Sequence, residues 1–304
     1  MDVIVAFLRT MIRAGTPLLL ATLGEIYTER SGIINLGLEG MMIVGASVAY
    51  VVAYHTGNPI LGILTAICIS GAMALIHAFL SITLRSNQII SGLALTMIGV
   101  GLSSYIGRDY VGKVGVKLPE IPIYPLSAIP YIGEILFKYD PIVYASLILT
   151  FILWFTLYRT KIGIIVRSVG ENPSVADSQG VNVYLVRYIC TILGGMLAGL
   201  SGAYLSLSYV PAWVEGMTGG RGWIAIALTI FAMWDPLKAL IGAYLFGGIE
   251  VLQYNLQPMG IPPNILAMTP YILTIVTLFI ASREKLRRRI GAPACLGQPY
   301  TREA

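Results

Sequence analysis

The sequence predicts an all-α, polytopic integral membrane protein. Hydrophobic residues make up 56% of its 304 residues and charged residues only 12%, about half the charged fraction of an ordinary soluble domain. Apolar runs of about 20 residues, each long enough to cross the hydrocarbon core of a bilayer, recur along the chain. We therefore expect about nine transmembrane helices, near residues 4–24, 32–54, 58–82, 87–106, 141–158, 185–210, 220–235, 237–256 and 264–282.

Three of these segments have distinctive features. The first, 4–24, does not look like a cleavable signal peptide, because it contains Arg9 and Arg13 and no small-residue cleavage site follows it. The sixth, 185–210, has small residues every four positions, which predicts close contact with neighbouring helices; they are Gly194, Ala198 and Gly202, and Gly195, Gly199 and Ala203. The seventh, 220–235, is short for a full crossing, so we expect it to be tilted, partly re-entrant or wrongly bounded.

Basic residues predict the orientation of the chain. If the spans alternate, one side carries 13 of the 20 basic residues, namely Arg30, Arg85, Arg159, Lys161, Arg167, Arg187, Lys238, Arg283, Lys285, Arg287, Arg288, Arg289 and Arg302. Because basic loops resist translocation, this side is expected to be cytoplasmic, with the N-terminus outside. The chain then divides into a transmembrane domain, 1–284, and a basic cytoplasmic tail, 285–304. The cluster at 283–289 indicates an anchor on anionic lipid rather than a nucleic-acid site.

The longest outer loop, 107–140, contains four prolines and cannot form one regular helix. Its apolar stretch, Tyr131–Phe137, fits the outer surface of the membrane. Two interpretations stay open: an ordered lid without a special role, and a docking platform for an extracellular partner.

Two glutamates lie inside predicted spans, where acidic residues are costly and usually face protein or water. Glu39 lies four residues after Asn35, so the two are expected to share a helix face. Glycines around them weaken this helix and favour a break at a cavity. Glu250 is the second case. For both glutamates, a place in a transport pathway and pairing between helices remain alternatives.

No pattern for an enzyme or a cofactor is present. The sequence lacks HExxH, GxSxG and Walker A motifs, and its cysteines and histidines have no metal-ligand spacing. The glycine-rich segment 215–223 lacks the Lys-Ser/Thr pair of a phosphate loop, so we expect a tight turn near the outer mouth of a pathway. We predict no catalytic residue, metal or cofactor.

The polar segment 159–187 is the main hydrophilic interruption between apolar runs. Asn172 is a suitable helix cap, Pro173 suits the first helical position, and Gly180 suits the end. Such a short helix is not stable alone, and the segment is longer than an ordinary connection. We therefore expect it to need a partner surface.

Three stretches resemble permease subunits of ABC importers: Glu29–Gly40, Gly170–Pro173 and Gly220–Ala225. The first, ERSGIINLGLEG, is the most specific, and the resemblance runs from about residue 13 to residue 283. The nearest branch is the nucleoside-type permeases, related to those for ribose and branched-chain amino acids. The resemblance implies a multi-pass protein of the cell membrane, paired with a second permease chain and two cytoplasmic ABC ATPase domains. A substrate-binding lipoprotein would deliver the substrate from outside.

The resemblance also implies which residues serve transport. Contact with the ATPase is expected at the short helix and its flanks: Gly170, Glu171, Asn172, Pro173, Ser174, Val175, Ala176, Asp177 and Gln179. Candidates for the substrate pathway are Asn35, Glu39, Asn87, Gln88, Ser91, Trp213, Thr218 and Trp223. Nucleobase rings suit stacking on tryptophan, and ribose hydroxyls suit asparagine and glutamine. The alternative for each polar residue is a hydrogen bond between helices.

Other functions remain open. An ABC permease for simple sugars or branched-chain amino acids would have the same architecture. A secondary transporter would instead follow an ion gradient and work without an ATPase. A membrane enzyme would need a reactive constellation, which the sequence lacks.

Overall fold

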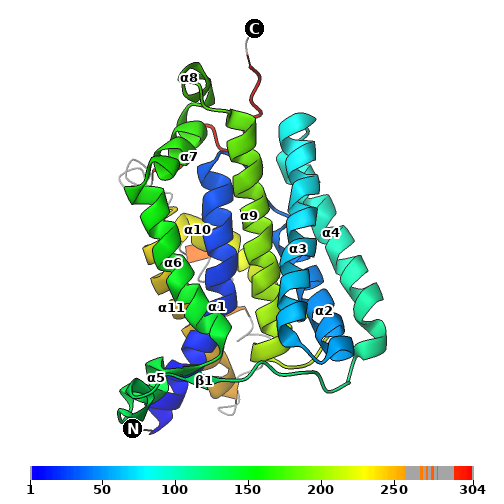
Figure 1. The fold of residues 1–304 in the computed structure, drawn as a ribbon, viewed down its shortest axis with the longest axis vertical. Helices are drawn as coiled ribbons and strands as arrows, with labels where there is room; N and C mark the ends of the chain where they lie inside the picture. The colour runs from blue at the N-terminus through cyan, green and yellow to red at the C-terminus, as the bar shows by residue number, and fades with distance from the viewer. Residues whose placement is uncertain are drawn as a thin grey trace.

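The protein is described by a computed structural model over residues 2–257 and 291–302, with isolated residues between 268 and 279. Long helices packed together form an elongated bundle (Figure 1). We call the end with the start of α1 the lower end, and the end with α7 and α8 the upper end, as Figure 1 is oriented. The long helices are α1 (Asp2–Arg30), α2 (Leu38–Thr56), α3 (Pro59–Ala78), α4 (Gln88–Gly107), α6 (Pro141–Arg159), α9 (Val183–Tyr204) and α11 (Pro236–Leu256). Shorter ones are α7 (Lys161–Glu171), α8 (Pro173–Ser178) and α10 (Arg221–Phe231).

The all-α membrane architecture predicted from the sequence is confirmed. Within the described residues, six helices are long and apolar enough to cross a bilayer: Val3–Arg30, Leu38–Thr56, Pro59–Thr83, Gln88–Tyr110, Pro141–Arg159 and Val183–Tyr209. They correspond to the first six predicted spans. Helix α10 has only 11 residues, in agreement with the short seventh segment. The ninth predicted span, 264–282, and the basic cluster 283–289 lie mainly outside the described residues.

Four helices begin at a dipeptide of Asn or Asp followed by proline. The side-chain oxygen of the first residue accepts a hydrogen bond from a backbone N–H of the first helical turn, and proline occupies the first turn. Proline suits this place because it lacks an N–H that would be left unpaired. The pairs are Asn58-Pro59, Asp140-Pro141, Asn172-Pro173 and Asp235-Pro236.

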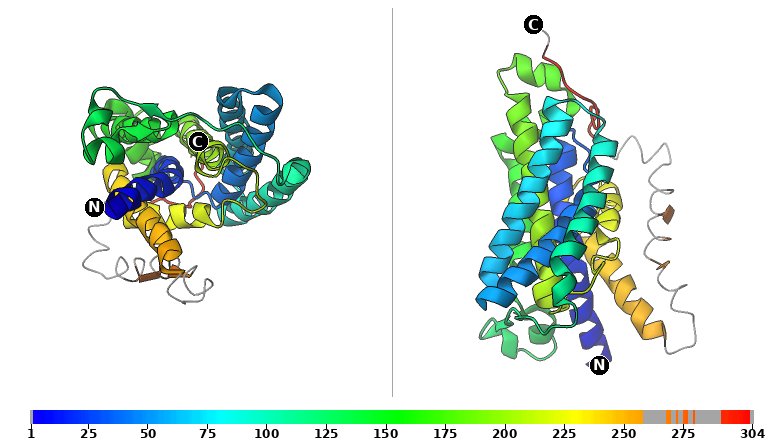
Figure 2. Two further views of the ribbon diagram at one scale, coloured as in Figure 1. Left: turned by 90° about the horizontal axis from the view of Figure 1, so that it is seen from below. Right: turned by 90° about the vertical axis from the view of Figure 1, so that its right-hand side faces the viewer.

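Helix α9 is the centre of the bundle and packs against α1, α2 and α3 (Figures 1 and 2). Its glycines make these contacts possible. A Cβ atom at Gly195 would lie 2.7 Å from the Ser70 carbonyl oxygen, and one at Gly202 would lie 2.0 Å from the Met42 carbonyl oxygen. The predicted role of the small residues in this span is therefore confirmed.

The loop 107–140 crosses the lower end from α4 to α6 (Figure 1) and, as predicted, is not one helix. It contains the short turns η2 (Arg108–Tyr110) and η3 (Leu126–Ala128) and the helix α5 (Ile132–Leu136). Strands β1 (Ile121–Pro122) and β2 (Lys138–Tyr139) pair antiparallel and close the loop at its base.

We expect Gly202→Ala to destabilise the bundle, because the added methyl group collides with the backbone of α2 at Met42. Gly101→Ala is the matched control: it makes the same change in α4, where no described atom lies within 4 Å of the new Cβ atom. Thermal unfolding in detergent should show a lower Tm for Gly202→Ala and an unchanged or higher Tm for Gly101→Ala. Equal Tm values would contradict the packing assigned to α9.

Candidate functional site

The second crossing of the membrane is only partly helical. Residues 31–37, which we call the unwound segment, form turns and irregular backbone, and α2 begins only at Leu38. Gly32 has a φ of 95°, which favours glycine. The predicted helix 32–54 is therefore wrong at its start. The predicted shared helix face of Asn35 and Glu39 is wrong too, because Asn35 precedes the helix.

Side chains from other helices satisfy the backbone of the unwound segment. Glu25 of α1 accepts a hydrogen bond from the Asn35 N–H at 3.2 Å. Gln88 of α4 accepts one from the Ile34 N–H at 2.8 Å, and the Thr96 hydroxyl donates to the Leu36 carbonyl oxygen at 2.8 Å. These bonds are needed because an unpaired backbone group inside a membrane protein costs several kcal/mol (on the order of 2–7).

His77 of α3 supports the same segment from a third helix. Its Nε2 atom lies 3.0 Å from the Ile34 carbonyl oxygen, and its Nδ1 atom lies 3.0 Å from the Ser91 hydroxyl. A carbonyl oxygen only accepts, so Nε2 carries the hydrogen and Nδ1 accepts from Ser91 in the neutral ring. Gln88 and Ser91, both predicted pathway residues, thus hold the unwound segment directly or through His77.

The chain is also irregular between α9 and α10. After α9 and its last turn η4 (Leu205–Tyr209), residues 210–220 run without a regular helix until α10 begins at Arg221. Helix α10 leads toward the upper end, where the Trp234 indole N–H donates to Glu29 of α1 at 2.5 Å. Helix α2 leads to the lower end, where the Tyr50 hydroxyl donates to the Lys113 carbonyl oxygen at 2.5 Å.

The starts of α2 and α10 meet at Glu39, in the first turn of α2. Its carboxylate accepts three hydrogen bonds: from the Thr218 hydroxyl at 2.6 Å, the Gly220 N–H at 2.9 Å and the Gly222 N–H at 2.6 Å. We call these four residues the half-helix junction. Glu39 is only 7% exposed, and its negative charge lies at the N-termini of both α2 and α10, where helix dipoles favour it.

Close approach at the junction depends on glycine. A Cβ atom at Gly222 would lie 2.6 Å from the Glu39 backbone nitrogen, so no larger residue fits there without displacement. The glycine-rich segment was predicted to form a turn at the outer mouth. Residues 215–220 do form turns, and Gly222, near the end of the segment, packs inside the bundle against Glu39 of α2.

Glu250, the second glutamate in a predicted span, pairs with an arginine. Arg221, the first residue of α10, forms an ion pair with the Glu250 carboxylate in α11, and both side chains are largely buried. The Arg221 guanidinium also donates to the carbonyl oxygens of Met217 and Thr218. For Glu250 the structure therefore shows pairing between helices.

The remaining predicted pathway residues are spread over the bundle. Asn87 is exposed and caps α4 by accepting from the Ile89 N–H at 3.0 Å. Trp213 is 1% exposed and packs with Ile43 and Tyr50, whereas Trp223 of α10 is 37% exposed. Their part in a pathway stays a prediction.

Sequence reasoning missed Glu25, Glu29, His77 and Arg187, all of which are buried and bound to the unwound segment or its surroundings. A signal was present for the first two. They lie four residues apart directly after the first predicted span, 4–24, so a helix that continues through them carries both acids on one face. His77 and Arg187 had no spacing that indicated a partner.

The predicted short helix of the polar segment is confirmed as α8. The Asn172 side chain accepts from the Val175 N–H at 3.1 Å, Pro173 opens the helix, and Gly180 follows it with a φ of 82°. Helix α7, which precedes α8, was not predicted. Together α7 and α8 form the upper end of the bundle beside α9 (Figure 1).

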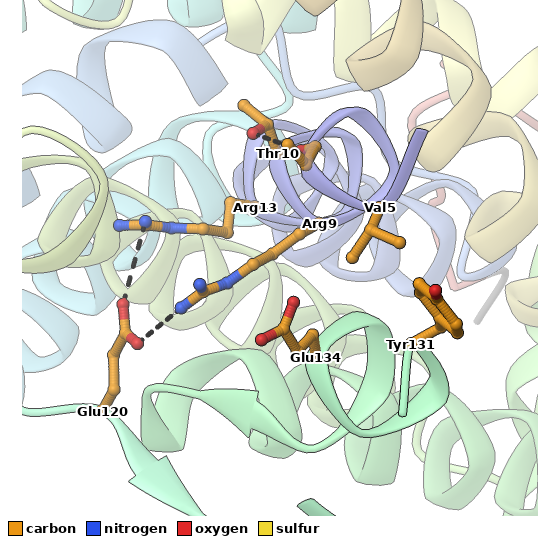
Figure 3. Close-up of a pocket in the computed structure, with 8 residues that line it drawn as sticks. Val5, Arg9, Thr10, Arg13, Glu120, Tyr131 and Glu134 are labelled. Atoms are coloured by element: carbon orange, nitrogen blue, oxygen red, sulfur yellow. Dashed lines mark hydrogen bonds and ion pairs between the residues drawn. The ribbon is translucent and has the colours of Figure 1, made fainter. Parts of the chain in front are cut away.

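A charged pocket of about 610 Å³ lies at the lower end, between α1 and the loop 107–140 (Figure 3). Arg9 and Arg13 of α1 both reach toward Glu120, with nitrogen-to-oxygen distances of 2.6 Å and 3.8 Å. Tyr131 and Glu134 lie on the other side of the pocket. The ion pairs fasten the loop to the start of α1.

We expect Glu39→Gln to destabilise the protein by about 2 kcal/mol, because an amide cannot accept hydrogen bonds at both of its terminal atoms and loses the charge that strengthens them. The control is Glu134→Gln, whose side chain is 54% exposed and makes only a surface ion pair. Equilibrium unfolding in mixed micelles measures both. A Glu39→Gln variant as stable as Glu134→Gln would show that the junction is not held by this carboxylate.

Comparison with known proteins agrees with this architecture. Residues 7–281 match the family described as the permease component of the branched-chain amino acid transport system. The chain is 41% identical to a putative glucose ABC transporter permease of Haloferax volcanii, over 97% of each chain. It is 37% identical to a guanosine ABC transporter permease of Bacillus subtilis, over 93% of this chain and 92% of the relative. It is 31% identical to a nucleoside ABC transporter permease of Lactococcus lactis, over 88% of this chain and 89% of the relative.

The match covers both irregular segments and the helices α7 and α8. With its six apolar helices, the chain is a multi-pass protein of the cell membrane and belongs to the branched-chain amino acid transport family of ABC permease components.

Proposed function

We propose that this permease carries nucleosides into the cell, with ATP hydrolysed on separate subunits. The observation that carries the ATP-driven part of the proposal is the exposed outer face of α8. Pro173 and Ala176 are buried against the protein, whereas Ser174, Val175 and Ser178 face away from it. Val175 is 57% exposed within the polar segment 159–187, where an apolar side chain gains from a partner surface.

In this proposal α8 and its flanks, from Gly170 to Gln179, contact a cytoplasmic ATPase. The upper end is then cytoplasmic and the N-terminus lies outside, with the nine spans and the basic tail arranged as the distribution of basic residues predicts. A second permease chain, identical or related, completes the pathway on two ATPase domains. A substrate-binding lipoprotein docks at the lower end, where the loop 107–140 and the charged pocket lie.

The pathway is proposed to run along the two irregular segments. Asn35 lies in the unwound segment, Gln88 and Ser91 support it, and Glu39 and Thr218 belong to the half-helix junction. Discontinuous helices are the parts of transporters that move or line a cavity, since their backbone is not fixed by a continuous ladder of hydrogen bonds. ATP shifts the protein between outward and inward openings only if it favours one of them.

The substrate class rests on the relatives. The guanosine permease of Bacillus subtilis and the nucleoside permease of Lactococcus lactis support a nucleoside. The putative glucose permease of Haloferax volcanii, at 41% identity, favours a sugar as the second candidate. Trp223, which is 37% exposed on α10, offers a ring for stacking on a nucleobase.

Uptake into proteoliposomes that contain the permease, its partner permease, the ATPase and the binding protein tests the substrate. We expect ATP-dependent uptake of labelled guanosine that excess unlabelled adenosine reduces and excess glucose does not. Uptake of glucose alone would replace the nucleoside by a sugar. Uptake that follows an ion gradient in the absence of the ATPase would indicate a secondary transporter.

We expect Val175→Asp to weaken ATPase binding and to lower ATP-dependent uptake at least about tenfold, because a charge replaces the exposed apolar contact of α8. The control for ATPase binding is Val114→Asp at the opposite, lower end, where the side chain is 90% exposed; it should leave copurification of the ATPase unchanged. Copurification of the ATPase with the permease and uptake are measured together. Unchanged copurification and uptake in Val175→Asp would remove α8 from the ATPase contact.

A further inference from the structure

The C-terminal segment 291–302, which we call the strap, lies across the upper end of the bundle (Figures 1 and 2). Its backbone is hydrogen-bonded to two elements that are far apart in the sequence. The Cys295 N–H donates to the Gly170 carbonyl oxygen in α7, and the Gly297 N–H donates to the Gly32 carbonyl oxygen in the unwound segment, each at 3.0 Å. The strap is therefore an ordered part of the fold, not only a charged tail.

Arg187 of α9 fixes the strap to the unwound segment from below. This side chain is 1% exposed. Its Nε atom donates to the Ser31 carbonyl oxygen at 3.2 Å, and its Nη1 atom donates to the Gln298 carbonyl oxygen at 3.1 Å. One buried guanidinium thus binds both the strap and the unwound segment. Sliding of one past the other would break these hydrogen bonds, which is costly.

The far end of the strap packs under α8. Tyr300 is 7% exposed and packs with Val169, Ala176 and Val183, which belong to α7, α8 and α9. Arg302 adds an exposed ion pair with Asp177, at 2.9 Å. The strap therefore covers the inner face of α8 and leaves its outer face, with Val175, free.

We propose that the strap transmits movement of α8 to the unwound segment and so to the half-helix junction. This inference rests on the proposed function, in which α8 contacts an ATPase. Helix α8 has six residues, too few to hold its position alone, so it moves together with what packs beneath it. The strap is bonded to α7, α8 and the unwound segment, and its turn at residues 294–297 is closed by hydrogen bonds of its own, from the Leu296 N–H to the Pro293 carbonyl oxygen and from the Gln298 N–H to the Cys295 carbonyl oxygen. It is therefore expected to move as one piece.

Two variants release the strap at different points. Tyr300→Ala removes the ring packed under α8 without touching the unwound segment. Gly297→Ala is strained at a φ of 76° and brings a Cβ atom within 2.8 Å of Ile34 in the unwound segment. Gly291→Ala is the matched control for the second variant: Gly291 also has a positive φ, 59°, but no described atom lies within 4 Å of its Cβ position. Phe151→Ala, which removes a ring that is 60% exposed on α6, away from the strap and from the loop 107–140, is the control for the first.

The readout is ATP hydrolysis by the reconstituted complex, with and without binding protein loaded with whichever of guanosine and glucose supports uptake. We expect Tyr300→Ala and Gly297→Ala to keep the ATPase bound but to lower the stimulation of hydrolysis by loaded binding protein, and uptake, at least about fivefold. Both controls should behave as the wild type.

A disulfide tests the position of the strap independently of transport. The Cys295 thiol lies 3.4 Å from the Glu171 carbonyl oxygen, and the Ala294 N–H lies 3.4 Å from the Glu171 carboxylate. In a Cys68→Ser background, Glu171→Cys should form a disulfide with Cys295 under mild oxidation of the assembled complex. The same variant with Cys295→Ser should not.

Three outcomes would overturn the proposal: absence of this disulfide, wild-type stimulation in both strap variants, and faster uptake in them, which would mean that the strap is a brake. In these cases the proposed function stands as long as the wild-type complex shows ATP-driven uptake. If the wild-type complex shows none, the proposed function fails and the role of the strap fails with it.

Discussion

The carboxylate of Glu39 joins the starts of two helices, α2 and α10, that each follow an irregular segment. Its three hydrogen bonds come from Thr218, Gly220 and Gly222, which precede or begin α10. Without an acceptor there, the first N–H groups of α10 would be buried without a partner, since a helix cannot satisfy them itself. The negative charge is in turn tolerated in the bundle because donors and two helix N-termini surround it.

The unwound segment shows how the protein manages irregular backbone inside a membrane. Three helices, α1, α3 and α4, each contribute a polar side chain to it: Glu25, His77 and Gln88. These residues bind backbone atoms, so they position the segment itself. The arrangement leaves the segment free of a helical ladder and yet holds it in one place.

Helix α9 and the strap connect the unwound segment to the upper end of the bundle. Small residues let α9 lie against α1, α2 and α3, and its upper part carries Arg187, which binds both the unwound segment and the strap. A continuous path of packed and bonded groups therefore leads from α8 through the strap and the unwound segment to Glu39. Each step is a direct contact, so a displacement at one end is not lost in flexible loops.

The sequence by itself determined the membrane class, the first six spans, the small residues of α9 and the limits of α8. These features follow from local properties: apolar runs of sufficient length, four-residue spacing, and the capping chemistry of Asn172, Pro173 and Gly180. It also singled out Glu39 as an unusual buried acid. Only the tertiary structure decided that Glu39 binds Thr218, 179 positions away, that α2 starts after Asn35, and that the strap lies on α7, α8 and the unwound segment. Such pairings depend on which helices become neighbours when the bundle packs, and residue type and spacing along one chain do not specify that.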